Sequence, residues 1–373
     1  MNPERHEAMN EFLRGAGWGA ASLSPLPGDA STRRYVRLHR GSESAMLMDQ
    51  PQHAEAPQCP PGVTPDQRRA LGYNAVARLA GADCGRFVAV ADFLRDRGLS
   101  APDVLAADVK SGFVLIEDLG DDLYANVLSN GHAGGEPTLY GAAVDALAKL
   151  HSEGAPATLG DGKPLHAYDE TALLAETDLM TEWFVPLALR RAASQDEREE
   201  HRTLWREALR PVLAAPSVFV HRDYHAQNLF WLPHREGTAR VGMIDFQDAV
   251  AGTTSYDLIS LLEDARRDVA PEVCEAMTRR YIEARQKTDT VFDGDAYRAQ
   301  AAVMAAQRNA KIAGIFARLY TRDGKPRYLS YLPRVWGYLE KDLRHPALGS
   351  LKRWYDRKIP MDARHQTITG EAA

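Results

Sequence analysis

The sequence HRDYHAQN (His221 to Asn228) follows the apolar run PSVFV and decides how the fold is interpreted. Within it, Asp223 lies five positions before Asn228. An aspartate and an asparagine at this separation, on a loop after a short strand, suit phosphoryl transfer. The carboxylate can accept the proton of an attacking hydroxyl while the amide oxygen holds a magnesium ion. The octapeptide therefore predicts a catalytic loop in which Asp223 is the base and His221 and Arg222 support the backbone.

A second acidic motif, ARVGMIDFQDA (residues 239–249), follows the first. It predicts a strand over residues 240–244 that delivers Asp245 at its end. A hard divalent cation that bridges phosphates prefers one or two carboxylates together with neutral oxygens, and Asp245 and Asn228 supply both. Each motif alone has an ordinary explanation, because HRD is only a tripeptide and acids often follow apolar strands. Their ordered combination favours catalysis over an inactive relative that keeps the fold.

The two motifs resemble those of the aminoglycoside phosphotransferase family, which are small-molecule kinases related to the protein kinases, and the resemblance covers nearly the whole chain. Four segments extend it in order: GDASTRRYVRL, AMLMDQP, FVLIEDLGDD and IDFQDAVAGTTSYDLISLLED. They are similar to the anomeric sugar kinases that phosphorylate N-acetylmuramate and N-acetylglucosamine at C1. The resemblance implies an enzyme of peptidoglycan recycling that uses ATP and Mg²⁺, takes a small amino sugar as its partner and produces a sugar 1-phosphate.

The resemblance also implies the fold class, which is α+β in a two-lobed, protein-kinase-like arrangement. A small antiparallel-sheet N-terminal lobe is expected over residues 1–117, and a larger, mainly helical C-terminal lobe over residues 118–373. The apolar strand FVLIE would end the first lobe, and the residues near Glu117 and Leu119 would bind adenine through backbone hydrogen bonds. Periodicity alone describes the same stretch equally well as a buried strand followed by exposed acids.

The segment GDASTRRY is expected to bind the nucleotide phosphates, although it has one glycine where protein kinases carry three. Ser31, Thr32 and the backbone amides can donate hydrogen bonds to phosphate oxygens. Arg33 and Arg34 come next, and neighbouring side chains on a strand point to opposite faces. Only one of the two arginines is therefore expected to face the nucleotide; the alternative is a solvent-facing arginine on a hairpin.

The lysine that protein kinases place on the third strand is missing, because Met48 occupies the end of the AMLM stretch and no lysine precedes Lys110. Its absence fits either an inactive relative or replacement of the lysine by Arg33 or Arg34. We favour replacement, because an inactive protein has no need of the catalytic loop and the metal-binding aspartate together. The similar sugar kinases also carry a Met-Asp pair at this point.

Acceptor-binding residues follow less directly from the sequence. Trp183 is a candidate platform for the sugar ring and Glu182 a candidate acceptor for its hydroxyls, although a tryptophan at helical spacing more often belongs to a core. Asp248 can contact sugar hydroxyls or a second metal ion. Asp257 resembles the family's structural aspartate beneath the catalytic loop. A final set of polar residues at helical intervals is expected to form a solvated face, with direct substrate contact as the alternative for each: Gln307, Arg308, Lys311 and Arg318.

The composition suits a cytoplasmic enzyme that acts on a small molecule. A length of 373 residues allows two lobes, and a net charge of −6 with a pI near 6.1 argues against a nucleic-acid-binding surface. Cys59, Cys84 and Cys274 show neither CxxC nor zinc spacing, so reduced thiols are expected. No apolar run reaches the roughly 18 residues of a membrane span, so no membrane contact is expected.

Periodicity predicts the remaining elements. A helix is expected over residues 5–16, followed by a hairpin in which Val36 and Leu38 share one face. Residues 51–66 contain five prolines and are expected to form a loop. A broken helical stretch should end at Gly98. The further helices are expected over residues 139–151, 171–213 with an interruption around Pro186, 271–285, 297–320 and 328–343.

The sequence leaves two other functions open. The acceptor can be another small hydroxyl compound, such as an aminoglycoside or a choline-like molecule. An aminoglycoside polycation would require a strongly acidic pocket, whereas the acids of residues 171–210 are largely balanced by arginines. The second alternative is a non-catalytic nucleotide-binding protein, which only the missing lysine supports.

Overall fold

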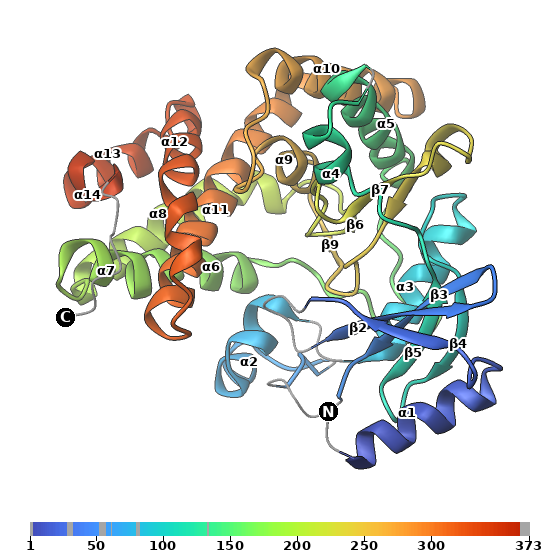
Figure 1. The fold of residues 1–373 in the computed structure, drawn as a ribbon. Helices are drawn as coiled ribbons and strands as arrows, with labels where there is room; N and C mark the ends of the chain where they lie inside the picture. Colours follow the sequence, from blue (N-terminus) through green and yellow to red (C-terminus); the bar gives the residue numbers. More distant parts are fainter. Residues whose placement is uncertain are drawn as a thin grey trace. The chain divides into compact units, whose positions relative to one another are not determined.

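The computed structural model describes residues 3–27, 33–51, 57–60, 62–79, 83–132 and 134–365 (Figure 1). The chain divides into two compact units. Unit 1 comprises residues 1–150, 156–166 and 226–249, and unit 2 comprises residues 151–155, 167–225 and 250–373. An antiparallel sheet in the N-terminal part and a mostly helical remainder confirm the predicted α+β class. The lobe boundary expected after Glu117 stays a prediction.

Unit 1 is built around a five-stranded antiparallel sheet with the strand order β1-β2-β3-β5-β4. The predicted hairpin is present and turns tightly at Gly41, whose φ of +62° suits a residue without a side chain. The strands of the sheet are β1 (Ser22–Pro25), β2 (Arg34–Arg40), β3 (Glu43–Asp49), β4 (Val104–Asp108) and β5 (Phe113–Glu117).

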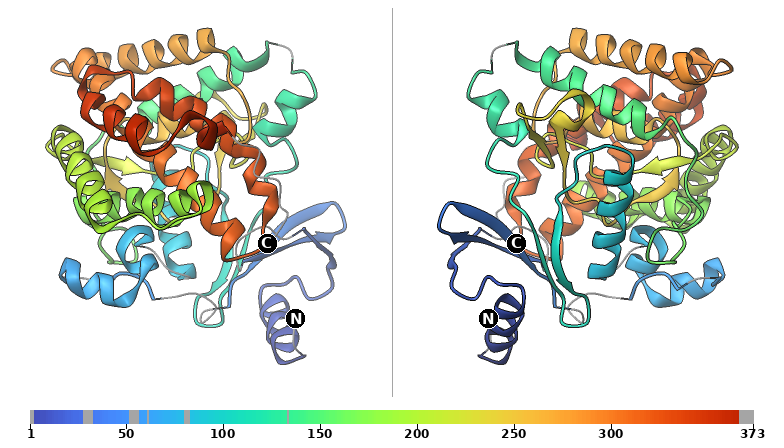
Figure 2. Two further views of the ribbon diagram at one scale, coloured as in Figure 1. Left: turned by 90° about the vertical axis from the view of Figure 1, so that its left-hand side faces the viewer. Right: turned by 90° about the vertical axis from the view of Figure 1, so that its right-hand side faces the viewer.

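One face of this sheet packs against helix α1 (Pro3–Gly15), which matches the helix predicted at the N-terminus. Val36 and Leu38 of β2 lie in one buried cluster with Met9 and Leu13 of α1, as the alternation in the sequence predicts. Figure 2 shows α1 beside the strands of this sheet. The opposite face is therefore left for the side chains that alternate with this set.

Two helices of unit 1 follow the proline-rich segment in the chain. Helix α2 (Pro65–Leu71) begins within the last residues of the predicted loop, because Thr64 and Gln67 form a capping box. A π-helical turn, η1 (Asn74–Arg78), follows. Helix α3 (Cys84–Asp96) then begins after Asp83, whose carboxylate caps it, and the chain turns away at Gly98 with a φ of +64°, where the stop was predicted.

The rest of unit 1 consists of helices and a short hairpin. Strands β7 (Leu229–Trp231) and β8 (Val241–Met243) pair in antiparallel register, so the strand predicted over residues 240–244 is present in slightly shorter form. The other elements are α4 (Tyr124–Ser129), α5 (Gly135–Leu150) and the 3₁₀ turn η3 (Gly237–Arg240).

Unit 2 is helical apart from the strand pair β6 (Val218–Val220) and β9 (Val250–Gly252). Helix α11 (Gly294–Thr321) contacts several of the other helices (Figure 1). None of the described helices is long and apolar enough to cross a membrane. The remaining elements are α6 (Glu170–Leu179), η2 (Met180–Phe184), α7 (Val185–Leu189), α8 (Gln195–Leu213), α9 (Tyr256–Leu262), α10 (Pro271–Thr288), η4 (Pro326–Tyr331), α12 (Leu332–Asp342), η5 (Pro346–Leu348), α13 (Gly349–Lys358) and α14 (Met361–His365).

The interruption expected around Pro186 lies a few residues later in the chain. Pro186 is the second residue of α7 and lacks the N–H that a continuing helix would use. A π-helical turn, η2, precedes it. The helical path ends only at Arg190, which adopts a left-handed conformation with a φ of +54°.

Gly314 of α11 provides a test of this packing. A Cβ atom there would lie 2.6 Å from the backbone carbon and 2.8 Å from the carbonyl oxygen of Leu179 at the end of α6. We therefore expect Gly314→Ala to lower the free energy of unfolding by about 1–3 kcal/mol. Gly337 of α12 is the matched control, because an added Cβ meets no atom within 4 Å. Gly337→Ala should leave stability unchanged or raise it by up to about 1 kcal/mol in urea unfolding. Equal urea midpoints for Gly314→Ala and Gly337→Ala would contradict the close packing of α11 on α6.

Candidate active site

The catalytic-loop motif is divided between the two units, since residues up to His225 belong to unit 2 and the segment that starts at Ala226 belongs to unit 1. In unit 2, strand β6 leads directly into His221. Asp257, in the first turn of α9, accepts hydrogen bonds from the backbone N–H of His221 at 2.7 Å and of Arg222 at 2.9 Å. A carboxylate near a helix N-terminus is favoured by the helix dipole. Asp257 thus lies where the sequence placed the structural aspartate.

His221 and Arg222 both fix the backbone of the loop. The buried His221 ring accepts the N–H of Asp223 through Nδ1 at 3.3 Å. Arg222 has a φ of +74° and a buried side chain whose Nη2 lies 2.7 Å from Glu176 Oε1. Asp223 itself is half-buried. This arrangement agrees with the expected supporting roles of His221 and Arg222.

In unit 1, the β7–β8 hairpin brings Asn228 and Asp245 together. Asn228 directly precedes β7, and Asp245 lies two residues after the end of β8. Between them, the Ile244 N–H donates to the Asn228 carbonyl at 3.1 Å. The Asn228 amide nitrogen lies 3.5 Å from Asp245 Oδ2. Asp245 has a φ of +63°, an unfavourable conformation for a residue with a side chain. Both residues predicted to hold a metal ion are therefore neighbours.

The chemistry of these groups fits a magnesium ion. With the Asn228 amide turned over, its oxygen would lie beside the Asp245 carboxylate. Gln247 is buried and donates to Asp245 Oδ1 at 2.9 Å, and its own Oε1 has no hydrogen-bond partner among the described residues. Oxygen donors of this kind, completed by phosphate oxygens and water, are what Mg²⁺ prefers.

The two arginines after the predicted phosphate loop lie in different environments, as strand alternation predicts. Arg33 is buried, and its Nη1 lies 3.0 Å from Asp245 Oδ1, whereas Arg34 is exposed. Burial alone would lower the pKa of the Arg33 guanidinium, but Tyr35, Asp245 and Asp248 outweigh that effect and raise the pKa. Arg33 is therefore a permanent cation beside Asp245. The predicted phosphate ligands Ser31 and Thr32 lie outside the described residues.

The Lys–Glu ion pair that protein kinases use to hold nucleotide phosphates has no counterpart on β3 and α3. Met48 is fully buried, and the Tyr35 hydroxyl donates to its sulfur at 3.6 Å. Helix α3 contains no glutamate. Instead, its Phe87 stacks on Phe246 of the DFQ sequence with ring centroids 4.9 Å apart, so aromatic packing links α3 to the residue after Asp245.

A cavity of about 180 Å³ lies on the face of the sheet opposite α1 and includes the predicted adenine-binding residues Glu117 and Leu119. Ligand sites for drug-sized molecules are about 300–1,000 Å³, so this volume suits a single planar heterocycle. In the described part of the chain, the Leu119 N–H donates to no protein acceptor. The apolar lining comes from Leu26, Tyr35, Met46, Phe87, Pro102, Ile116, Leu123, Phe230 and Ile244.

Three residues predicted to contact the acceptor have mixed surroundings. Asp248 is buried and forms an ion pair with Arg78 at 2.7 Å, so its carboxylate already has a cationic partner. Trp183 is half-buried and Glu182 exposed, and both lie in the π-helical turn η2 of unit 2. Turns of this kind are often found at functional sites. The roles of all three residues in sugar binding stay predictions.

The solvated face expected for the polar residues of α11 was wrong. Gln307 is fully buried, and Arg308 is 7% exposed. Lys311 Nζ lies 2.9 Å from Glu176 Oε1, which the sequence reasoning missed. The signal was available, because Glu176 is the acid that interrupts the apolar face of residues 172–179. A charged residue in such a stripe requires buried partners.

Comparison with known proteins defines the class. Residues 22–299 match the phosphotransferase enzyme family, and the chain belongs to this family. It is 46% identical over 370 residues to the N-acetylmuramate/N-acetylglucosamine kinase of Caulobacter vibrioides, covering 98% of this chain and 99% of that protein. It is 34% identical to the protein of the same name in Pseudomonas aeruginosa, with 91% and 90% covered. The family resemblance of the sequence is thus confirmed.

Solved structures support the fold. An aminopropanol kinase associated with a microcompartment has a TM-score of 0.58 at 14% identity, covering 93% of this chain and 98% of that chain. The choline kinase of Streptococcus pneumoniae has a TM-score of 0.57 at 11% identity, covering 91% and 99%. An ADP-bound aminoglycoside phosphotransferase has a TM-score of 0.53 at 16% identity, covering 91% and 97%. The predicted kinase-like fold is confirmed.

Asp257 provides a test of how the loop is held. Asparagine has one acceptor oxygen, so Asp257→Asn would set an NH₂ group against one of the two loop N–H donors. We expect the free energy of unfolding to fall by about 1–3 kcal/mol. Asp264→Asn is the control, because Asp264 is also buried but, among the described residues, accepts one hydrogen bond, from the N–H of Arg266, which asparagine can still accept. Urea unfolding should show the larger loss for Asp257→Asn, and an equal loss would contradict the double acceptor role.

Proposed function

We propose that this protein is an ATP-dependent kinase that phosphorylates the anomeric hydroxyl of N-acetylmuramate, N-acetylglucosamine or both, as part of peptidoglycan recycling. The observation that carries the proposal is the placement of Asn228 beside Asp245 at the β7–β8 hairpin, the pair of oxygen donors that this chemistry requires. The choice of acceptor is supported by the near-full-length similarity to kinases named for these two sugars.

The reaction would proceed by in-line transfer. The anomeric oxygen attacks the γ-phosphorus of ATP, the bond from that phosphorus to the bridging oxygen of ADP breaks, and the hydroxyl proton passes to the Asp223 carboxylate. An anomeric hydroxyl is more acidic than an ordinary sugar hydroxyl, so one carboxylate is a sufficient base. Asn228 and Asp245 would hold Mg²⁺, which neutralises charge on the phosphates. The products are the sugar 1-phosphate and ADP.

The nucleotide would be held by unit 1. The cavity at Glu117 and Leu119 is apolar and lies beside the Leu119 amide, which suits adenine recognition by a backbone donor. Arg33 would supply the cation that other kinases obtain from the strand lysine, because it is buried, permanently charged and next to Asp245. Ser31 and Thr32 would add hydroxyl donors to the phosphates.

The acceptor would be held by unit 2. Trp183 is half-buried in η2 and can offer an apolar face to the sugar ring, and Glu182 beside it can accept hydroxyl hydrogen bonds. Asp248 of unit 1 is a weaker candidate, because contact with a sugar or second metal would have to compete with Arg78.

A product analysis tests this function. The protein is incubated with ATP and Mg²⁺ and with N-acetylmuramate, N-acetylglucosamine, kanamycin or choline, and the products are identified by ³¹P and ¹H NMR. We expect phosphate at C1 of one or both amino sugars, and we expect Asp223→Asn to abolish turnover while nucleotide binding persists. Phosphorylation of kanamycin or choline alone would redirect the proposal to another acceptor. ATP binding without any turnover would indicate a non-catalytic protein.

The two neighbouring arginines provide an internal comparison for phosphate binding. Arg33→Ala removes the buried cation beside Asp245, whereas Arg34→Ala removes an exposed one. We expect the Kd for ATP·Mg²⁺, measured by calorimetry, to rise about tenfold or more in Arg33→Ala, since charged hydrogen bonds contribute about 1.5–3 kcal/mol. Arg34→Ala should bind like the unmodified protein. Equal affinities for both variants would exclude Arg33 as the replacement cation.

A further inference from the structure

A buried carboxylate in unit 2 lies at the centre of a network that includes Arg222. Glu176 is fully buried on α6. Its oxygens lie 2.7 Å from Arg222 Nη2 and 2.9 Å from Lys311 Nζ. It also accepts a hydrogen bond from Gln307 Nε2 at 3.0 Å and another from the Tyr168 hydroxyl. Glu176 is thus held by four donors from three parts of unit 2.

The charges in this network favour an ionised Glu176. Burial would raise the pKa of the Glu176 carboxyl, but Lys311 and Arg222 outweigh it and the pKa is lowered. A carboxyl with a lowered pKa remains ionised above its ordinary range and loses its charge only in acid. The network therefore stays intact across neutral pH.

The residue that Glu176 holds has an unfavourable backbone conformation. Arg222 has a φ of +74°, in the left-handed region that residues with a Cβ atom adopt only when their surroundings enforce it. Two restraints act on it: Asp257 accepts its N–H, and Glu176 binds its guanidinium. The guanidinium also lies over the Tyr168 ring, 4.7 Å from the centroid. The conformation of Arg222 directs the chain into Asp223, the next residue.

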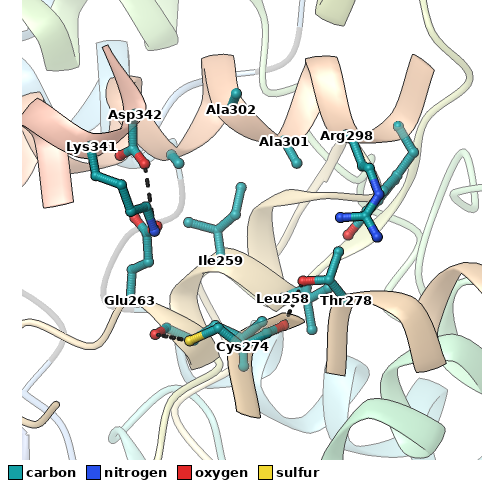
Figure 3. Close-up of a pocket in the computed structure, with 13 residues that line it drawn as sticks. Leu258, Ile259, Glu263, Cys274, Thr278, Arg298, Ala301, Ala302, Lys341 and Asp342 are labelled. Atoms are coloured by element: carbon teal, nitrogen blue, oxygen red, sulfur yellow. Dashed lines mark hydrogen bonds and ion pairs between the residues drawn. The ribbon is translucent and has the colours of Figure 1, made fainter. Parts of the chain in front are cut away.

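Both restraints are attached to helix α11. Gln307 and Lys311 of α11 contact Glu176. Arg308 donates to Ser260 Oγ at 2.9 Å, and Asn309 donates to Glu263 at 2.7 Å, so α11 also binds the helix that carries Asp257. Figure 3 shows Glu263 facing Lys341 and Asp342 at one end of a cavity of about 280 Å³ lined by α9. Helix α9 is therefore held at Ser260 and at Glu263, the residue that follows its last turn.

We propose that Glu176 is a positioning residue for catalysis. By binding the Arg222 guanidinium, it maintains the left-handed backbone before Asp223 and so sets the direction in which the Asp223 carboxylate meets the acceptor hydroxyl. The inference rests on the proposed function for the role of Asp223 as base. Its physical content, the restraint of the loop, does not depend on which acceptor is used.

A charge-removing substitution with a matched control tests this role. Glu176→Gln keeps the size of the side chain but weakens its hold on Arg222. Glu197→Gln is the control, because Glu197 is also a largely buried acid of unit 2 with one arginine and one lysine partner, Arg191 and Lys358. We expect kcat to fall about tenfold or more in Glu176→Gln with KM for ATP changed by less than about threefold, because misplacing a reacting group lowers turnover more than binding. The control should keep kcat. Equal kcat in both variants would overturn the proposal.

A second pair of variants separates positioning from general stability. Glycine adopts a positive φ freely and alanine does not. Arg222→Gly should therefore retain a kcat about fivefold or more above that of Arg222→Ala. In the Arg222→Gly background, Glu176→Gln should reduce kcat by less than about threefold, because its target is gone. The mechanism would be contradicted if kcat of Arg222→Gly were as low as that of Arg222→Ala. It would also be contradicted if Glu176→Gln lowered kcat as strongly in the Arg222→Gly background as in the unmodified protein.

Hydrogen exchange distinguishes failure of this inference from failure of the proposed function. Exchange in the peptide covering residues 218–225 is followed by mass spectrometry without nucleotide or sugar. Faster exchange in Glu176→Gln than in Glu197→Gln supports the restraint even if the amino sugars are not substrates. Identical exchange in the two variants would overturn it even if the sugars are phosphorylated.

Discussion

The arrangement of the loop depends on two buried carboxylates that hold one residue, Arg222, through its backbone and through its side chain. Asp257 binds the backbone of His221 and Arg222, and Glu176 binds the Arg222 side chain. A buried charge is tolerated only when partners replace the lost water. Asp257 obtains two N–H donors at a helix start, and Glu176 obtains two cations. The partners that stabilise these two buried charges are thus also the groups that shape the loop.

In unit 1, Met48 stands where protein kinases have a lysine, and neighbouring residues also differ from the protein-kinase pattern. A methionine at position 48 would leave a glutamate on α3 unpaired, and α3 has none. The aromatic contact between Phe87 and Phe246 takes over the link between α3 and the residue after Asp245. Arg33, which directly precedes β2, is a buried cation next to Asp245. The missing lysine therefore belongs to a consistent set of differences and does not indicate decay.

The sequence predicted those parts of the fold and site in which chemistry constrains spacing. The neighbourhood of Asn228 and Asp245 follows from a short hairpin between them, and the different environments of Arg33 and Arg34 follow from strand alternation. The buried face of α11 could not be predicted in the same way. Helical spacing shows that Gln307 and Lys311 share a side, but not that this side meets Glu176, a residue more than a hundred positions earlier. Long-range pairing of buried charges leaves only a weak local signal.

The composition of α11 explains how such long polar side chains can be buried. Several of its buried positions are small, including Ala306, Ala310, Ala313 and Gly314. Gly314 allows the helix to approach the backbone of Leu179 at the end of α6. At this separation Gln307 and Lys311 reach across to the carboxylate on the same helix α6, whereas larger residues would hold the helices apart and stretch both contacts. Small residues of α11 therefore help to set the position of Glu176, and through Arg222 they influence the residue expected to act as base.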